Sequence, residues 1–138
     1  MTEEEAKRCV IVVDEALPAG KAANAAAVIA LTVGKIWPEL AGRDLIDASG
    51  FAHPGLIPIG IAILGAEASE LVKIRAKALE RTLGVVDFPV QGQQTTDYEA
   101  FCAAVSQVGT SQLEYVAVGV YGPRKAVGKV VGKYGLLK

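Results

Sequence analysis

The residues best placed to do chemistry in this 138-residue chain lie where an apolar strand meets an alanine-rich helix. Residues 10–13 form an unbroken β-branched run, typical of a strand covered on both faces. Asp14 follows this run, and Gly20-Lys21 then opens a helix that continues to Ile36. The first turn of a helix has unpaired backbone N–H groups and a partial positive charge, to which Lys21 adds a full charge. The junction is therefore predicted to bind an anion such as phosphate or a carboxylate.

A second polar loop follows the strand predicted at residues 85–90. Ligands of open α/β sheets bind beyond the carboxyl ends of the strands, where both loops are expected. If the two strands are neighbours, the loops surround one pocket; if they are not, the loops are unrelated and solvated. The predicted ligand-binding residues are Gly20, Lys21, Asn24, Gln91, Gln93, Gln94 and Thr95.

Gly20-Lys21 does not form a nucleotide-triphosphate loop. The pattern GxxxxGK[ST] requires glycine at position 15 and serine or threonine at position 22, where the chain has Glu15 and Ala22. Basic residues without acidic neighbours also mark the C-terminal segment, which offers either a phosphate contact or a solvated helix face. They are Arg124, Lys125, Lys129, Lys133 and Lys138.

The remaining reactive side chains are few. His53 is the single histidine and lies in a turn beside Pro54, where a solvated role is more common than a catalytic one. Cys9 and Cys102 are far apart and have no metal-ligand spacing, which predicts buried, reduced thiols. No cofactor and no metal are expected.

Strands that alternate with helices predict an α/β protein. The expected architecture is a three-layer α/β/α sandwich with a mixed, mostly parallel sheet of four to five strands, formed by one domain over residues 1–138. Strands are expected at residues 10–13, 45–48, 56–64, 85–90 and 115–120, with the second and third forming a hairpin. Helices are expected at residues 22–36, 66–83 and 124–134, and a further helix follows a capping box at Thr96 and Glu99.

The formal net charge of −1 argues against a protein that coats nucleic acid by charge alone. Residues 1–8 lack the apolar region of a signal peptide. The longest apolar run, residues 56–66, is too short to span a bilayer. A cytoplasmic protein without membrane contact is expected.

Three features together resemble the archaeal and eukaryotic (class II) peptidyl-tRNA hydrolases: the VIVV strand, Gly20-Lys21 before an alanine-rich helix, and a final strand-Gly-Pro-helix ending in Gly-Leu-Leu. The segment LPAGKAANAAAVIAL is more similar still to an uncharacterised bacterial family of this fold, a domain of unknown function. The resemblance implies a peptidyl-tRNA hydrolase II-like fold and a homodimer.

Those hydrolases cut the ester between a peptide and the 3′ end of tRNA. Lys21 matches their lysine, whereas Ala25 and Val28 stand where they have glutamine and histidine. Val90-Gln91-Gly92 matches their Asp-Ala-Gly motif, so the aspartate that would orient water is missing, and Gln91 cannot act as a base. The resemblance therefore supports the fold more strongly than the activity. Residues that would carry catalysis in an active enzyme are Lys21, Asp14 and Thr95.

The sequence thus predicts a small α/β protein that binds a small anion, a nucleotide or an RNA end at Gly20-Lys21. Two alternatives stay open. One is an active hydrolase of peptidyl-tRNA-type esters, and the other is a non-catalytic dimeric subunit whose apolar helix faces a partner.

Overall fold

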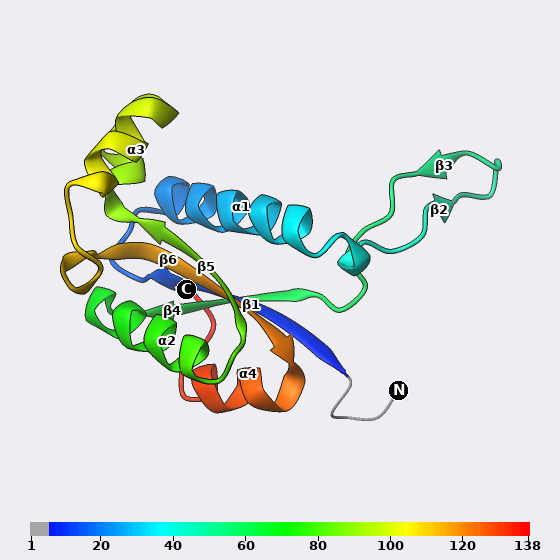
Figure 1. Cartoon of the computed structure of the whole chain (residues 1–138). Coiled ribbons are helices and arrows are strands. Elements are labelled where there is room, and N and C mark those ends of the chain that lie inside the picture. The colour runs from blue at the N-terminus through cyan, green and yellow to red at the C-terminus, as the bar shows by residue number, and fades with distance from the viewer. Residues whose placement is uncertain (1–5) are drawn as a thin grey trace.

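A computed structural model describes residues 6–138 as a mixed four-stranded sheet with strand order β4–β1–β6–β5 (Figure 1). The strands are β1 (Lys7–Asp14), β4 (Ile61–Ala66), β5 (Gly84–Pro89) and β6 (Tyr115–Pro123). β1 is parallel to β4 and antiparallel to β6, which is in turn antiparallel to β5. The mixed sheet is confirmed, but its mostly parallel character is not, because β6 separates β1 from β5 and leaves one parallel pair.

Helices cover both faces of this sheet (Figure 1). α1 (Ala19–Ile36) lies on one face, and α2 (Ala68–Glu80) and α4 (Arg124–Val131) lie on the other. α3 (Tyr98–Ser106) packs beside the short helix η2 (Val90–Gln93) that follows β5. The prediction about a signal peptide falls partly on residues 1–5, which lie outside the described residues.

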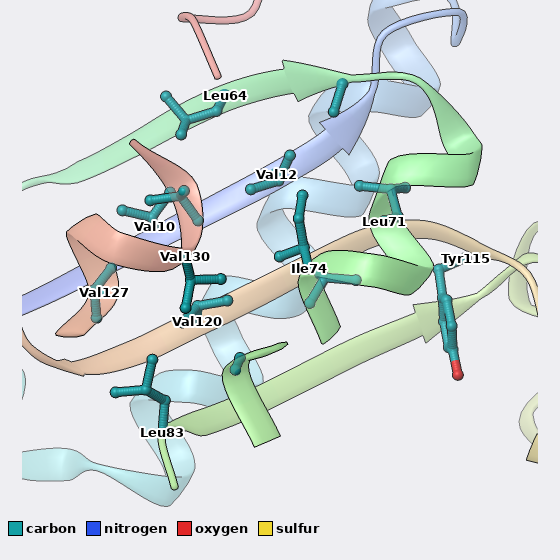
Figure 2. Packing of buried hydrophobic residues seen from close by; sticks show 14 residues of the cluster. Val10, Val12, Leu64, Leu71, Ile74, Leu83, Tyr115, Val120, Val127 and Val130 are labelled. Atoms are coloured by element: carbon teal, nitrogen blue, oxygen red, sulfur yellow. The ribbon is translucent and has the colours of Figure 1, made fainter. Parts of the chain in front are cut away.

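Side-chain alternation along β1 supplies both cores of the sandwich. Val10 and Val12 face α2 and α4, where Figure 2 shows them near Leu71, Ile74 and Val127. The alternate residues of β1 pack beneath α1: Cys9, Ile11 and Val13. Because both faces of β1 are covered from Cys9 to Val13, its sequence is apolar without interruption over these residues.

Small residues bring α1 close to the sheet. Ala22 and Ala25 are buried on the inner side of the helix. Gly119 of β6 lies beneath Ile29, and a Cβ at Gly119 would stand 2.6 Å from the Ile29 Cγ2 atom. The close contact fixes the distance of α1 from the sheet and so helps to position its first turn.

The predicted hairpin between residues 45–48 and 56–64 is wrong. β2 (Leu45–Ile46) pairs instead with β3 (Ala52–His53), and the later apolar residues join the main sheet as β4. Gly60, with a φ of 67°, ends the preceding loop, so the strand begins only at Ile61. Residues 42–56 form an arm, with β2 and β3, that is closed at its base by a hydrogen bond from the Gly42 N–H to the Leu56 carbonyl and projects from the body beyond the C-terminal end of α1 (Figure 1).

The predicted capping box at Thr96 is also wrong by one residue. Asp97 is the N-cap of α3, and its Oδ1 accepts a hydrogen bond of 2.8 Å from the Ala100 N–H. A carboxylate is favoured there because it adds charge stabilisation at the positive end of the helix.

Candidate functional site

The backbone N–H groups in the first turn of α1 have few hydrogen-bond acceptors among the described residues. Its N-cap is Pro18, which makes no side-chain hydrogen bond, and the first turn contains no acidic residue. The Ala22 N–H is bonded to the Pro18 carbonyl at 3.0 Å. The N–H groups of Ala19, Gly20 and Lys21 have no partner among residues 6–138. Because the side chain of Lys21 is exposed, this end of α1 presents three free donors and one cation to solvent.

The second predicted loop does reach this turn. The Gln93 side chain in η2 donates a hydrogen bond of 3.1 Å from Nε2 to the Lys21 carbonyl. β1 and β5 are not neighbours, so the expectation about adjacent strands fails. The loops meet nevertheless, since β1 and β5 run in the same direction and end at the same edge of the sheet.

The other predicted residues divide into two groups. Gln91 and Thr95 turn inward: the Thr95 hydroxyl donates to the Gln91 carbonyl at 2.8 Å, and the Gln91 Oε1 atom is buried without a partner among the described residues. Asn24 and Gln94 are exposed. The structure therefore places Gln93 at Lys21 and gives Gln91 and Thr95 a role inside their own loop.

The side chains of Asp14 and Thr95, the predicted catalytic partners of Lys21, form hydrogen bonds with backbone groups close to them in the sequence. The Asp14 Oδ1 atom accepts a hydrogen bond of 3.0 Å from the Ala16 N–H, in a turn that ends β1. Within the described part of the chain, no hydrogen bond or ion pair joins either side chain to Lys21.

A cavity of about 410 Å³ lies directly beside the start of α1. One wall is the inner edge of the helix, and the other is formed by β4 and the C-terminal tail. The tail is held there because the Leu137 N–H donates to the Ile63 carbonyl at 2.9 Å. The residues that line the cavity are Glu15, Leu17, Ala19, Ala22, Ala23, Ala26, Ile63, Leu137 and Lys138. Sequence reasoning missed Leu17 and Leu137, for which the only signal was an apolar residue in an otherwise polar segment.

The remaining reactive side chains lie away from this site. His53 is on the arm, where its Nε2 atom lies 2.9 Å from Asp47 Oδ2. Cys9 is buried, and burial raises the pKa of its thiol to about 11. Cys102 is exposed, so the prediction of two buried thiols is wrong for this residue, since Phe101 is the member of α3 that faces inward.

Residues 6–138 contain no group of three His, Cys, Asp or Glu side chains arranged to hold a metal ion. None of the helices formed by these residues has both the length and the apolar character needed to cross a bilayer.

Comparison with known proteins agrees with the fold and assigns no activity. The sequence model of a family described as protein of unknown function (DUF2000) matches residues 7–138. The structure of Atu0240, a protein of unknown function from Agrobacterium tumefaciens strain C58, superposes with a TM-score of 0.86 at 18% sequence identity. The superposition covers 99% of this chain and 98% of that one. No curated protein matches the sequence.

Proposed function

The chain belongs to the DUF2000 family, and we propose that it binds an anion that carries an apolar group, at the start of α1. One observation carries the proposal: Ala19 contributes a free backbone N–H group and also lines the apolar cavity beside the helix. A ligand can therefore place a charged head on the helix end and an apolar tail in the cavity.

The head of the ligand is recognised by the helix terminus. Three free N–H groups and the partial positive charge of α1 attract a phosphate or a carboxylate. A Cβ at Gly20 would have no atom within 4 Å, so the backbone there is open to a ligand. Glu15 lines the cavity and repels an anion from its interior. The charge is therefore expected at Lys21 and the uncharged part beside Glu15.

The tail of the ligand is recognised by apolar contact. Leu17, Ile63 and Leu137 provide the larger side chains of the cavity. Each methylene group transferred there from water contributes about 0.8 kcal/mol. A nucleotide or an RNA end qualifies through its phosphate, but only a ligand with an apolar substituent uses the whole site. Because Asp14 and Thr95 are not joined to Lys21, binding is proposed and ester hydrolysis is not.

The test is a titration of isotope-labelled protein with hexyl phosphate and with inorganic phosphate, followed through the amide signals of Ala19, Gly20 and Lys21. Hexyl phosphate is expected to bind more tightly than phosphate. Lys21→Ala is expected to weaken both by about fivefold, the effect of ~1 kcal/mol for a charge at a helix end. Lys35→Ala, at the other end of α1, is the matched control. Equal affinity of Lys21→Ala and wild type contradicts the proposal.

A second function, self-association, is favoured by the outer face of α1. No charged residue occurs between Lys21 and Lys35, and Leu31 on the outer face is 80% exposed. A helix that carries apolar side chains on its outer as well as its inner side is usually covered on both sides. Only the inner side of α1 is covered by this chain.

The arm adds a second apolar surface that is rigid. At its base the Gly42 N–H donates to the Leu56 carbonyl at 2.9 Å, and a Cβ on Gly55 would overlap the Gly42 carbonyl oxygen. At its tip Asp47 Oδ1 accepts hydrogen bonds from the N–H groups of Ser49 and Phe51, at 2.9 and 3.0 Å. A preorganised element loses little conformational entropy when it binds.

We infer that a second copy of the chain covers these two surfaces. Seven of the twelve exposed large hydrophobic residues of the described chain lie on α1 and the arm: Val28, Leu31, Ile36, Leu45, Ile46, Phe51 and Leu56. One partner of a standard interface contributes about 800 Å², which α1 and the arm are expected to supply together. The arm projects beyond the end of its own α1 and is free to lie on another copy (Figure 1).

Light scattering during gel filtration tests this second function. Wild type at micromolar concentration is expected at twice the chain mass of 14.3 kDa. Leu31→Glu and Phe51→Glu are expected to be monomers, whereas Leu79→Glu, an exposed leucine of α2, is expected to stay dimeric. A monomeric wild type contradicts the inference.

A further inference from the structure

The opposite end of the sheet carries another concave feature, at the start of β1. Pairing of β1 with β6 begins at Lys7, whereas pairing with β4 begins only at Cys9, opposite Ile61. Lys7 and Arg8 therefore have no strand beside them on the β4 side. A cavity of about 550 Å³, here named the β1 notch, occupies this open edge. Small-molecule sites typically have volumes of about 300–1,000 Å³.

Three cations line the notch and approach it from different directions: Lys7, Arg8 and Arg124. Side chains alternate between the two faces of a strand, so Lys7 and Arg8 flank the open edge from opposite faces. Arg124 comes from the first turn of α4. The Arg8 Nη1 atom lies 4.0 Å from where a Cβ of Gly128 would stand, which places its guanidinium group along α4.

Backbone contacts hold these cations together although they come from the two ends of the sequence. Lys7 is opposite Pro123 in the β1–β6 ladder. The Arg124 N–H donates a hydrogen bond of 2.8 Å to the Ala6 carbonyl, which ties the start of α4 to the residue before β1. The cluster is therefore built by the fold, and the basic C-terminal segment supplies only one of its three members.

No neighbouring carboxylate neutralises the notch among the described residues. The four ion pairs of residues 6–138 include none of the three cations, and no acidic residue lines the cavity. An adjoining cavity that shares Lys7 is lined by one acidic residue, Glu39. Three like charges at one edge repel one another, and a bound anion would relieve that repulsion.

We propose that the β1 notch binds the terminal phosphate group of a nucleotide or of a nucleic-acid chain. A terminal phosphate matches the donor set, because each guanidinium group can donate two parallel hydrogen bonds to phosphate oxygens and Lys7 adds a point charge. Apolar Ile59 and Ala62 line the same cavity and can contact the sugar or base. This site is independent of the one at Lys21, which lies at the other end of the sheet.

The test is calorimetric titration of the full chain with AMP, with adenosine and with a short RNA carrying a 5′-phosphate. AMP is expected to bind and adenosine is not, since the phosphate provides the recognition. Arg8→Gln and Arg124→Gln are each expected to weaken AMP binding about tenfold, the effect of one charge-assisted hydrogen bond. Lys77→Gln, which removes an exposed cation of α2 that lines neither cavity, is the matched control and should bind as wild type does.

Both sources of the phosphate are distinguished by the same titrations. Tighter binding of the 5′-phosphorylated RNA than of AMP identifies a nucleic-acid end, and equal or weaker binding identifies a free nucleotide. The proposal is overturned if adenosine binds as well as AMP, or if the arginine variants, folded by circular dichroism, bind AMP as tightly as wild type.

Discussion

The Gln93 side chain donates its hydrogen bond to the Lys21 carbonyl across 72 positions of sequence, and this bond joins the loop after β5 to the first turn of α1. The acceptor belongs to the backbone of the residue whose ammonium group faces solvent. The loop thus holds the helix end in place without neutralising its charge. Gln93 therefore positions the helix end at the proposed ligand site, and the charge of Lys21 attracts the proposed anion.

Gln93→Ala is expected to lower the free energy of unfolding by about 0.5–1.5 kcal/mol, the net value of one hydrogen bond. It is also expected to weaken hexyl phosphate binding, because the helix end loses its anchor. Urea denaturation and the titration described above measure the two effects. Gln94→Ala is the matched control, since Gln94 is exposed and makes no side-chain hydrogen bond to other described residues. Equal effects of the two variants would remove the positioning role.

Replacement of two glycines by alanine is expected to change the free energy of unfolding in opposite directions. At Gly119 the new Cβ would stand 2.6 Å from Ile29 Cγ2, so overpacking is expected to destabilise the protein by about 1–3 kcal/mol. At Gly34, on the exposed side of α1, no atom lies within 4 Å of the new Cβ. Alanine there should stabilise by about 0.5–1 kcal/mol through helix propensity. Urea midpoints of both variants measure the difference.

The contact between Glu70 and Tyr134 predicts a pH dependence at both extremes. The Tyr134 hydroxyl donates to Glu70 Oε1 at 2.9 Å, and Lys73 lies 2.9 Å from Glu70 Oε2. Lys73, Tyr134 and Lys133 lower the pKa of Glu70 to about 2. Burial and the Glu70 carboxylate raise the pKa of Tyr134 to about 12.

The signs follow from the folded and unfolded pKa values. Glu70 stabilises the fold above its ordinary pKa of 4.5, and this contribution is lost as the pH falls towards about 2. Tyr134 contributes below its ordinary pKa of 10.0, and this is lost as the pH rises towards about 12. Ultraviolet titration of tyrosinate should show that Glu70→Gln lowers the highest tyrosine pKa. Tyr134→Phe should remove that titration step, and its persistence would assign the step to another tyrosine.

The two cysteines should differ in reactivity towards a thiol reagent. Cys102 is exposed on α3 and is expected to react rapidly in the native protein. Cys9 is 1% exposed and its pKa is raised to about 11 by burial, so it should react only after unfolding. Cys102→Ser is expected to abolish the fast reaction, and a remaining fast phase would mean that β1 opens locally.

The elements that sequence reasoning located best are those whose burial is uniform. β1 and the inner side of α1 have apolar residues at every position that the sheet covers, so residues 10–13 and 22–36 were predictable. The arm and the loop after it were not, because Leu56 and Ile59 are apolar yet remain exposed. Local apolar character cannot distinguish a strand of the sheet from a projecting surface, since that depends on what lies opposite.

The candidate site was predictable in part for a similar reason. A lysine in the first turn of a helix is a local feature, and Lys21 lies where the sequence indicated. The insertion of β6 between β1 and β5 is a nonlocal pairing, and so is the contact of Ile63 with the C-terminal tail. These pairings decide that Gln93 reaches α1 while Gln91 does not, and they create the cavity wall at Leu137.

The C-terminal tail also covers an edge strand that could otherwise pair with another chain. β4 is an edge strand, and its outer backbone groups would be open to pairing with another chain. The Gly65 N–H donates to the Gly135 carbonyl at 3.0 Å, and the Leu137 N–H donates to the Ile63 carbonyl, so the tail occupies that edge. Loss of the last few residues would therefore expose the edge of β4 and remove one wall of the cavity, so resistance to aggregation and the proposed ligand binding would be lost together.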